Sequence, residues 1–175
     1  AHASDPFVLG LVGSNHAREF HPDGPPLFRR LARAGICTRV HGGTVLLRHF
    51  PPSRPDPRIA LLPVDPGGVA AFLATIDAFL YWPGPRRPDF LPTHLHAAMA
   101  CGLPVVCRRG VDAAEVVRNG GNGFLVDDEG DVLRVVEELR RDCALARRVG
   151  DAARATARET YGAGYRDRVR AMLVG

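Results

Sequence analysis

The chain has 175 residues, of which 46% are hydrophobic and 24% are charged, and its net charge is +4. This balance is typical of one soluble globular domain that is long enough to bury a core. All 23 basic residues are arginines, and no basic stripe is interleaved with aromatic residues, so nucleic acid is not an expected partner.

The composition also narrows the setting in which the protein works. The lack of lysine, with many alanines, prolines and glycines, indicates a GC-rich bacterial genome rather than a function. The amino terminus lacks the charged and apolar regions of a signal peptide, and no apolar run approaches the length of a membrane-spanning segment. The four cysteines form no zinc-binding spacing. We therefore expect a cytoplasmic protein with reduced thiols, no metal and no cofactor.

Strands and helices are predicted to alternate along the chain. Short apolar runs predict strands at residues 7–13, 38–40, 59–64, 78–82, 103–107 and 123–126. Helices are predicted at residues 27–34, 69–75, 94–101, 112–119, 144–161 and 165–174, and in an amphipathic segment capped by Asp131. The alternation predicts an α/β fold: one domain, residues 1–175, with a doubly wound, Rossmann-like parallel sheet and helices on both of its faces.

The stretch from residue 78 to residue 107 predicts one βαβ unit around which the rest is organised. A proline-rich loop, 83–92, follows the strand, Thr93 is a plausible helix N-cap, and Gly102 stands where a C-cap glycine in the left-handed conformation is expected. Ligands of open parallel sheets bind at loops that leave the carboxyl ends of strands. We therefore expect the site in loop 83–92, beside the loop that follows Gly13.

Three blocks resemble retaining GT-B glycosyltransferases of the large family 4 group. Residues 96–106, HAAMACGLPVV, resemble the family's EAMACGLPVV block. Residues 115–126, EVVRNGGNGFLV, resemble its E-x-V-x-D-G-x-N-G-x-L-V block, and residues 72–81 resemble the segment before its donor loop. The resemblance implies the carboxyl-terminal domain, which binds a nucleoside diphosphate sugar. It also implies an amino-terminal, acceptor-binding GT-B domain as a partner, which this sequence lacks.

The first βα turn is implied to lie near the donor diphosphate. Gly13, Ser14 and Asn15 form this turn, where glycine permits a close approach of the backbone to phosphate. Ser14 stands where the family has an arginine, and Arg18 in the same loop is the candidate substitute. The helix that opens at Thr93 offers the positive end of its dipole. The alternative is a solvated loop without a ligand.

A second set of candidates aligns with two glutamates of the family that lie eight positions apart. The resemblance assigns Asp89, the first member, to the sugar hydroxyls, which makes it the candidate catalytic carboxylate. Ala97, the second, has no side-chain acceptor for the ribose of the nucleotide. His94 or His96 is the candidate replacement, because a neutral imidazole both accepts and donates hydrogen bonds. Each histidine is otherwise a partly exposed helix residue.

The remaining candidates line the donor in the family. Phe90 and Leu91 replace a glycine-bearing loop that offers backbone N–H groups to phosphate, and Pro92 beside them has no N–H group. Val64 matches a residue that lines the base pocket, although a core residue at a strand end is the other reading.

These implications lead to two main hypotheses of different classes. The first is the nucleotide-sugar-binding domain of a hexosyltransferase that works without metal and with retention of configuration, and that is inactive as an isolated domain. The alternative is a degenerate GT-B domain with a binding or scaffolding role and no catalysis, for which Ala97, Pro92 and the missing lysine argue. A non-hydrolysing sugar-nucleotide epimerase shares the fold, but no motif supports it.

Overall fold

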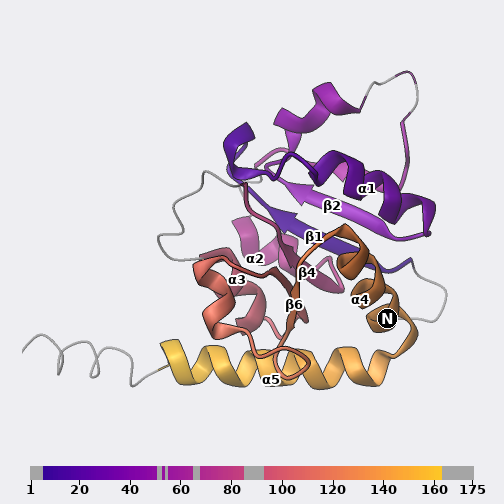
Figure 1. The fold of residues 1–175 in the computed structure, drawn as a ribbon. Coiled ribbons are helices and arrows are strands. Elements are labelled where there is room, and N and C mark those ends of the chain that lie inside the picture. Colours follow the sequence, from indigo (N-terminus) through magenta and orange to yellow (C-terminus); the bar gives the residue numbers. More distant parts are fainter. Residues whose placement is uncertain (1–5, 51–52, 54, 65–67, 85–92, 163–175) are drawn as a thin grey trace, which may run out of the picture.

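The computed structural model describes residues 6–50, 53, 55–64, 68–84 and 93–162. Within these ranges six parallel strands form one sheet in the order β3-β2-β1-β4-β5-β6 (Figure 1). The strands are β1 Val8–Val12, β2 Cys37–His41, β3 Ile59–Leu61, β4 Ala78–Tyr81, β5 Val105–Arg108 and β6 Phe124–Val126. The predicted doubly wound parallel sheet is confirmed.

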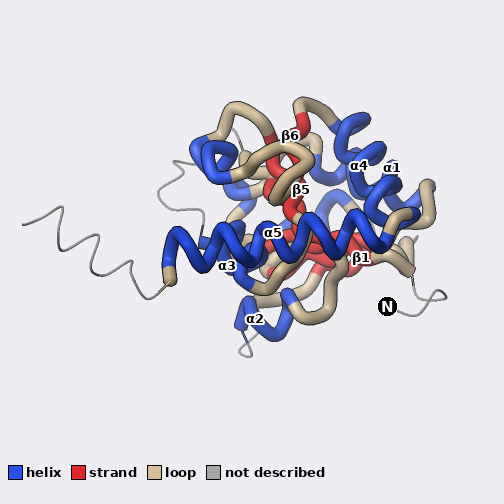
Figure 2. The backbone as a smooth tube through the Cα atoms, turned by 90° about the horizontal axis from the view of Figure 1, so that it is seen from below, coloured by secondary structure: helices blue, strands red, loops and turns tan. Residues whose placement is uncertain are grey.

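Helices cover both faces of the sheet, as expected. The α-helices are α1 Gly24–Arg33, α2 Gly68–Leu73, α3 Thr93–Ala100, α4 Glu129–Arg141 and α5 Cys143–Tyr161. Three 3-10 helices, η1 Ala17–Glu19, η2 Thr44–His49 and η3 Asp112–Val116, lie in the described connections. α1 and α4 pack on one face and α2 and α3 on the other, while α5 runs past both layers (Figure 2).

The two cores follow from the alternation of side chains along the strands. On β4, Leu80 and the following Trp82 face the α1 and α4 layer, whereas Phe79 and Tyr81 face α2 and α3. Because both faces are covered, the strands read as continuous apolar runs, the pattern from which they were predicted. Helix α5 contributes Val149 to one core and Ala153 to the other, and so it joins the two layers.

The predicted caps and helix ends were partly wrong. Helix α4 is capped by Asp128, not Asp131, because the Asp128 side chain accepts a 2.9 Å hydrogen bond from the backbone N–H of Asp131. The helix expected over residues 112–119 is only the 3-10 helix η3. It stops because the buried Asn122 side chain binds the Arg118 N–H and the Val116 carbonyl, two backbone groups that a longer helix would use.

Other boundaries differ by a few residues. Helix α1 begins at Gly24, three residues before the predicted start, with prolines in its first turn. Strand β3 ends at Leu61 instead of residue 64. The predicted helix 165–174 lies outside the described residues.

Gly102 takes the left-handed conformation that was predicted, with φ +76°. Its N–H donates to the Met99 carbonyl at 2.9 Å, and the Leu103 N–H donates to the Ala98 carbonyl at 3.1 Å, which is the Schellman pattern. A Cβ atom at Gly102 would lie 2.4 Å from the Arg154 guanidinium. Gly123 packs closely against β5, since a Cβ there would stand 2.5 Å from Val105.

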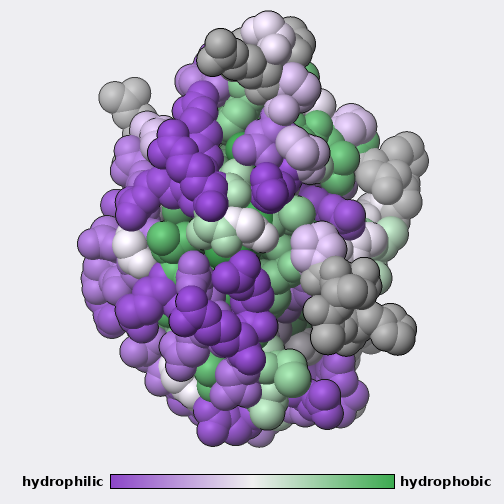
Figure 3. Space-filling model, turned by 90° about the vertical axis from the view of Figure 1, so that its right-hand side faces the viewer, coloured by the Kyte–Doolittle hydropathy of each residue, from purple (hydrophilic) through white to green (hydrophobic). Residues whose placement is uncertain are grey.

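The surface is mainly polar on the face at the right of Figure 1, with only small apolar spots between hydrophilic side chains (Figure 3). Among the described residues, no helix combines the length and the apolar character that crossing a membrane requires.

Candidate functional site

The candidate site lies where the direction of the chain through the sheet reverses. Strands β2 and β3 lie on one side of β1, whereas β4, β5 and β6 follow on its other side. The connections that leave β1 and β4 therefore lead to opposite faces of the sheet. Ligands of open α/β sheets bind at such a switch point, outside the carboxyl ends of the strands.

The end of β2 shapes the loop that follows β1. The Gly13 N–H donates to the His41 carbonyl at 2.9 Å, so this amide belongs to the sheet. Gly42 has φ +65°, and a Cβ atom there would stand 2.1 Å from the Gly13 carbonyl oxygen. Asn15 also has a positive φ, 65°. Its side-chain oxygen accepts hydrogen bonds from Thr44 Oγ1 at 2.7 Å and from the backbone N–H of Val45 at 2.8 Å. The loop is thus held by its own protein contacts.

Ser14 is hydrogen-bonded to a carboxylate that sequence reasoning missed. Its backbone N–H donates to Glu19 Oε2 at 2.6 Å, and its hydroxyl donates to Glu19 Oε1 at 2.5 Å. Arg18, the candidate substitute for the family's arginine, is exposed in η1 next to Glu19. The first exposed backbone amide after β1 is therefore occupied by a negative group of the chain itself.

Pro83 and Gly84, at the start of the loop after β4, contact the loop after β1. Phe20 and Pro83 form an antiparallel β-bridge, and the Gly84 N–H donates to the Glu19 carbonyl at 3.1 Å. A Cβ atom at Gly84 would stand 2.5 Å from the Arg18 carbonyl oxygen, so glycine is needed for this approach. Residues 85–92 lie outside the described residues, and the predictions for Asp89, Phe90 and Leu91 stay predictions.

The other sequence candidates also follow the carboxyl ends of strands. Val64 is 54% exposed, three residues beyond the end of β3. Thr93 is the exposed first residue of α3, and His94 beside it is half-buried. Ala97 packs against the core under α3, where a methyl group suits its surroundings. The fold brings Val64 and the start of α3 to the same edge of the sheet as Gly13.

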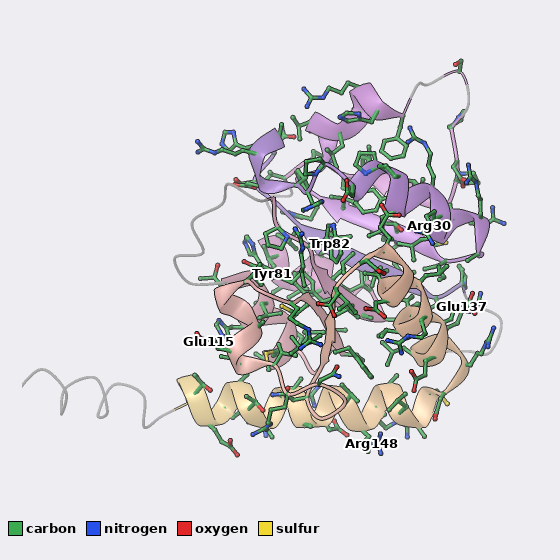
Figure 4. All side chains as sticks on the ribbon, in the orientation of Figure 1. Arg30, Tyr81, Trp82, Glu115, Glu137 and Arg148 are labelled. Carbon is green, nitrogen blue, oxygen red and sulfur yellow. The ribbon has the colours of Figure 1, made fainter. Side chains whose placement is uncertain are left out.

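A polar cluster at the same edge was not predicted. Trp82 after β4 is buried, and Arg108 at the end of β5 lies over its ring at 5.3 Å. Arg30 of α1 pairs with Glu129 of α4 at 2.8 Å (Figure 4 labels Trp82 and Arg30). An open cavity of about 420 Å³ lies among these residues and Asp127. Four acidic residues and two arginines line it, so the lining is predominantly acidic.

His21, in the connection between β1 and α1, contacts this cluster through Trp82. Its ring meets the Trp82 ring edge-on, with centroids 5.6 Å apart, and its side chain is only 10% exposed. Burial and then the nearby Arg108 guanidinium lower the pKa of His21, while the carboxylates of Asp23 and Glu129 act against that shift. The neutral ring fits the contact that Nδ1 makes, because Nδ1 accepts the Asp23 N–H at 3.2 Å.

The asparagines of the downstream motif, residues 115–126, stabilise the fold. The buried Asn122 accepts the Arg118 N–H at 2.6 Å and donates to the Val116 carbonyl and to Thr156 Oγ1 of α5. Asn119 accepts the Leu125 N–H at 2.9 Å. Glu115 is exposed on η3 (Figure 4). Sequence spacing located this motif, but its packing role is visible only in the structure.

Part of this edge is chemically suited to an anion. It offers an exposed guanidinium at Arg18 and the first turn of α3, whereas the backbone amide and the hydroxyl of Ser14 are taken by Glu19. Among the residues that the structure describes, no group of three or more His, Cys, Asp or Glu side chains is arranged to hold a metal ion.

The sheet order defines the class: this is a Rossmann-like domain with a fold found in GT-B proteins. Residues 56–142 match the family described as glycosyl transferases group 1. Over this segment, just under half of the chain, the sequence is similar to the group 1 glycosyl transferases. No curated protein matches its sequence.

Solved structures share the fold. HepE from Anabaena, in complex with UDP-glucose, has a TM-score of 0.79 at 17% identity, over 98% of this chain and 50% of that one. Sucrose-phosphate synthase from Thermosynechococcus elongatus has a TM-score of 0.68 at 18% identity, over 99% and 47%. The C-terminal domain of LpcC from Francisella tularensis has a TM-score of 0.64 at 10% identity, over 90% and 87%. The chain thus spans about half the length of the first two.

Proposed function

We propose that this domain binds a nucleoside diphosphate sugar in the crevice between the loops that follow β1 and β4. The observation that carries the proposal is the direct joining of these loops, through Gly84 and the Glu19 carbonyl, at the switch point of a GT-B sheet. HepE, which has the same fold, was solved with UDP and with UDP-glucose. In a complete two-domain protein, the reaction is transfer of a hexose to an acceptor.

Each part of the donor has a proposed set of contacts. The diphosphate lies near Ser14, Arg18 and the first turn of α3, where backbone N–H groups and the helix dipole favour negative charge. The nucleobase lies near the exposed Val64. Asp89 accepts hydrogen bonds from the sugar hydroxyls. The departing diphosphate is stabilised by these fixed charges and dipoles without a metal, and the sugar is transferred with retention.

Transfer requires a second domain. Closure of an amino-terminal GT-B domain over the crevice would exclude water and align the donor with the acceptor, and positioning of this kind supplies several kcal/mol of a barrier. The isolated chain is therefore expected to bind a donor and to transfer no sugar. The cytoplasmic location and the bacterial source expected from the sequence stay predictions.

Two observations favour the second candidate, a degenerate domain that binds or scaffolds without catalysis. Ala97 packs its methyl group into the core where the family has a ribose-binding glutamate, and Glu19 occupies the Ser14 amide. Loss of one carboxylate contact costs roughly 1–3 kcal/mol of binding. We therefore expect dissociation constants in the high micromolar to millimolar range.

Isothermal titration of the chain with UDP, GDP and ADP tests the proposal. Weak binding that differs among the three bases is expected, without sugar transfer from the matching nucleotide sugar. Asp89→Asn should reduce the preference for the nucleotide sugar over the bare diphosphate, whereas Asp151→Asn, an exposed position on α5, should leave the preference unchanged. No binding at millimolar concentration refutes the donor site. An unchanged preference in Asp89→Asn refutes the role of Asp89.

A further inference from the structure

The contact between Glu19 and Ser14 places a carboxylate where the proposed function needs a phosphate. Gly13 donates its N–H to the sheet, and the next amide, Ser14, faces Glu19. The two oxygens of the carboxylate each take one donor of Ser14, the backbone N–H at 2.6 Å and the hydroxyl at 2.5 Å. A phosphate group would use the same pair of donors, since it too presents neighbouring anionic oxygens.

The contact is built by a short turn. Helix η1 brings position 19 back toward position 14, and the Glu19 N–H donates to the His16 carbonyl at 3.0 Å. The Glu19 carbonyl accepts the Gly84 N–H at 3.1 Å. The backbone of Glu19 is thus fixed by two hydrogen bonds that do not involve its side chain.

We infer that the Glu19 carboxylate is an internal competitor for the anion position at Ser14, which a nucleoside diphosphate must displace in order to bind. This inference rests on the proposed function. Two effects oppose binding while Glu19 stays in place. One amide hydrogen cannot make a full hydrogen bond to two anions at once. A carboxylate beside a phosphate also repels it and raises the free energy of the complex.

The competitor also gives the site a selectivity. A ligand that touches only Ser14 gains little, since it replaces one anion with another. A nucleotide gains further contacts from its base and ribose, and so it has binding energy to offset the displacement. The domain should therefore discriminate against inorganic phosphate and pyrophosphate more strongly than a loop with a free amide would. The resembled family has an arginine at position 14. Because Ser14 is uncharged, Glu19 is held here by two hydrogen bonds and not by an ion pair with residue 14.

Three variants separate occupancy from charge. Glu19→Ala removes both the charge and the group that covers Ser14. Glu19→Gln removes the charge but keeps a side chain of the same shape, whose oxygen still accepts the Ser14 N–H. Asp23→Asn is the matched control, because it removes one exposed negative charge near the same edge without a contact to Ser14. The backbone bonds of residue 19 are retained in all three, and circular dichroism checks that each variant folds.

The readouts are titration with UDP, GDP and ADP, and the NMR shift of the Ser14 amide during titration with pyrophosphate. Glu19→Ala should bind the preferred diphosphate about tenfold more tightly than the wild type, about 1.4 kcal/mol, and should gain a pyrophosphate response at Ser14. Glu19→Gln should gain less, and Asp23→Asn should match the wild type. Binding of the nucleoside without phosphates should not change in any variant.

The outcomes keep the two proposals apart. Equal diphosphate affinity in the wild type and Glu19→Ala overturns the competitor while the donor site stands. Equal gains in Glu19→Ala, Glu19→Gln and Asp23→Asn reduce the effect to net charge and also overturn it. A pyrophosphate response at Ser14 that Glu19→Ala gains, without nucleotide binding by any form of the chain, supports the competitor and refutes the proposed function. No anion response in any variant refutes both.

Discussion

Replacing Gly42 with alanine tests how the end of β2 positions the loop after β1. Gly42 has φ +65°, and a Cβ atom there would stand 2.1 Å from the Gly13 carbonyl oxygen and 3.1 Å from the Asn15 nitrogen. The left-handed backbone alone costs an alanine about 1 kcal/mol. The clash is with backbone, which does not rotate away, and repacking of this kind adds about 2 kcal/mol. We expect a total loss of about 3 kcal/mol in the free energy of unfolding.

Gly120→Ala is the matched control for this variant. Gly120 has a similar φ, +72°, but no atom within the described part of the chain would come within 4 Å of its Cβ. Its replacement should cost only the backbone part, about 1 kcal/mol. Urea denaturation measures both losses, and the corresponding falls in melting temperature are about 6–12 °C and 2–4 °C.

Ligand binding gives the second readout. A shifted Gly13–Asn15 turn should weaken UDP binding in Gly42→Ala, whereas Gly120→Ala should bind UDP as the wild type does. Equal losses of stability in the two variants would show that the contact with Gly13 is not under strain. Wild-type UDP affinity in a strongly destabilised Gly42→Ala would separate the loop from the site.

Further substitutions test the cap, the buried imidazole and the motif. Gly102→Val should cost about 1 kcal/mol or more, since valine is forced to a positive φ; an unchanged thermal melt contradicts this. Because the pKa of His21 is lowered in the folded state, the unfolded chain binds the proton first as pH falls below the ordinary histidine range. As pH falls through this range, the free energy of unfolding should decrease, and it should level off once the pH is below the pKa of His21 in the folded state. His21→Gln should flatten this slope, and an unchanged slope refutes its origin. Asn122→Ala should cost about 2–3 kcal/mol in urea, because it strands buried backbone groups; a loss below about 1 kcal/mol contradicts the network.

The sheet could be predicted because each strand is buried on both faces. Runs such as residues 78–82 are apolar throughout, which is what a central parallel strand requires. A glycine directly after a predicted helix indicates a left-handed C-cap, and Gly102 does have φ +76°. The helix over residues 112–119 was wrong because a side chain from position 122 competes for its backbone, and no local periodicity reports such a contact.

The site was harder to predict than the sheet for a geometric reason. The sequence placed Gly13 and the loop after β4 at one edge, and Gly84 does contact the β1 loop there. Glu19 was missed because its role depends on a 3-10 turn that returns it to Ser14, and nothing in a polar loop marks that turn. The contact between Arg108 and Trp82 was missed because it depends on which strand ends are neighbours and which face each side chain takes.

The pairing between β1 and β4 joins the two halves of the sheet, β1–β3 and β4–β6, and it is shorter than the pairing between β1 and β2. Five residue pairs join β1 to β2, but only two, Leu9 with Ala78 and Gly10 with Phe79, are in register between β1 and β4. Asp77 strengthens the amino end of this seam between the two halves by accepting the Val8 N–H at 2.8 Å. At its carboxyl end stand the bridge and the Gly84 bond, on the loops after β1 and β4.

A narrow seam of this kind sets the free energy at which one half of the sheet opens from the other, below that of global unfolding. Amide hydrogen exchange at Gly10, whose N–H faces β4, reports that opening directly. A ligand held by both loops binds the closed seam and not the open one, so it slows this exchange by a factor of about 1 + [L]/Kd. This junction thereby becomes a gauge of donor occupancy that needs neither an acceptor nor catalysis.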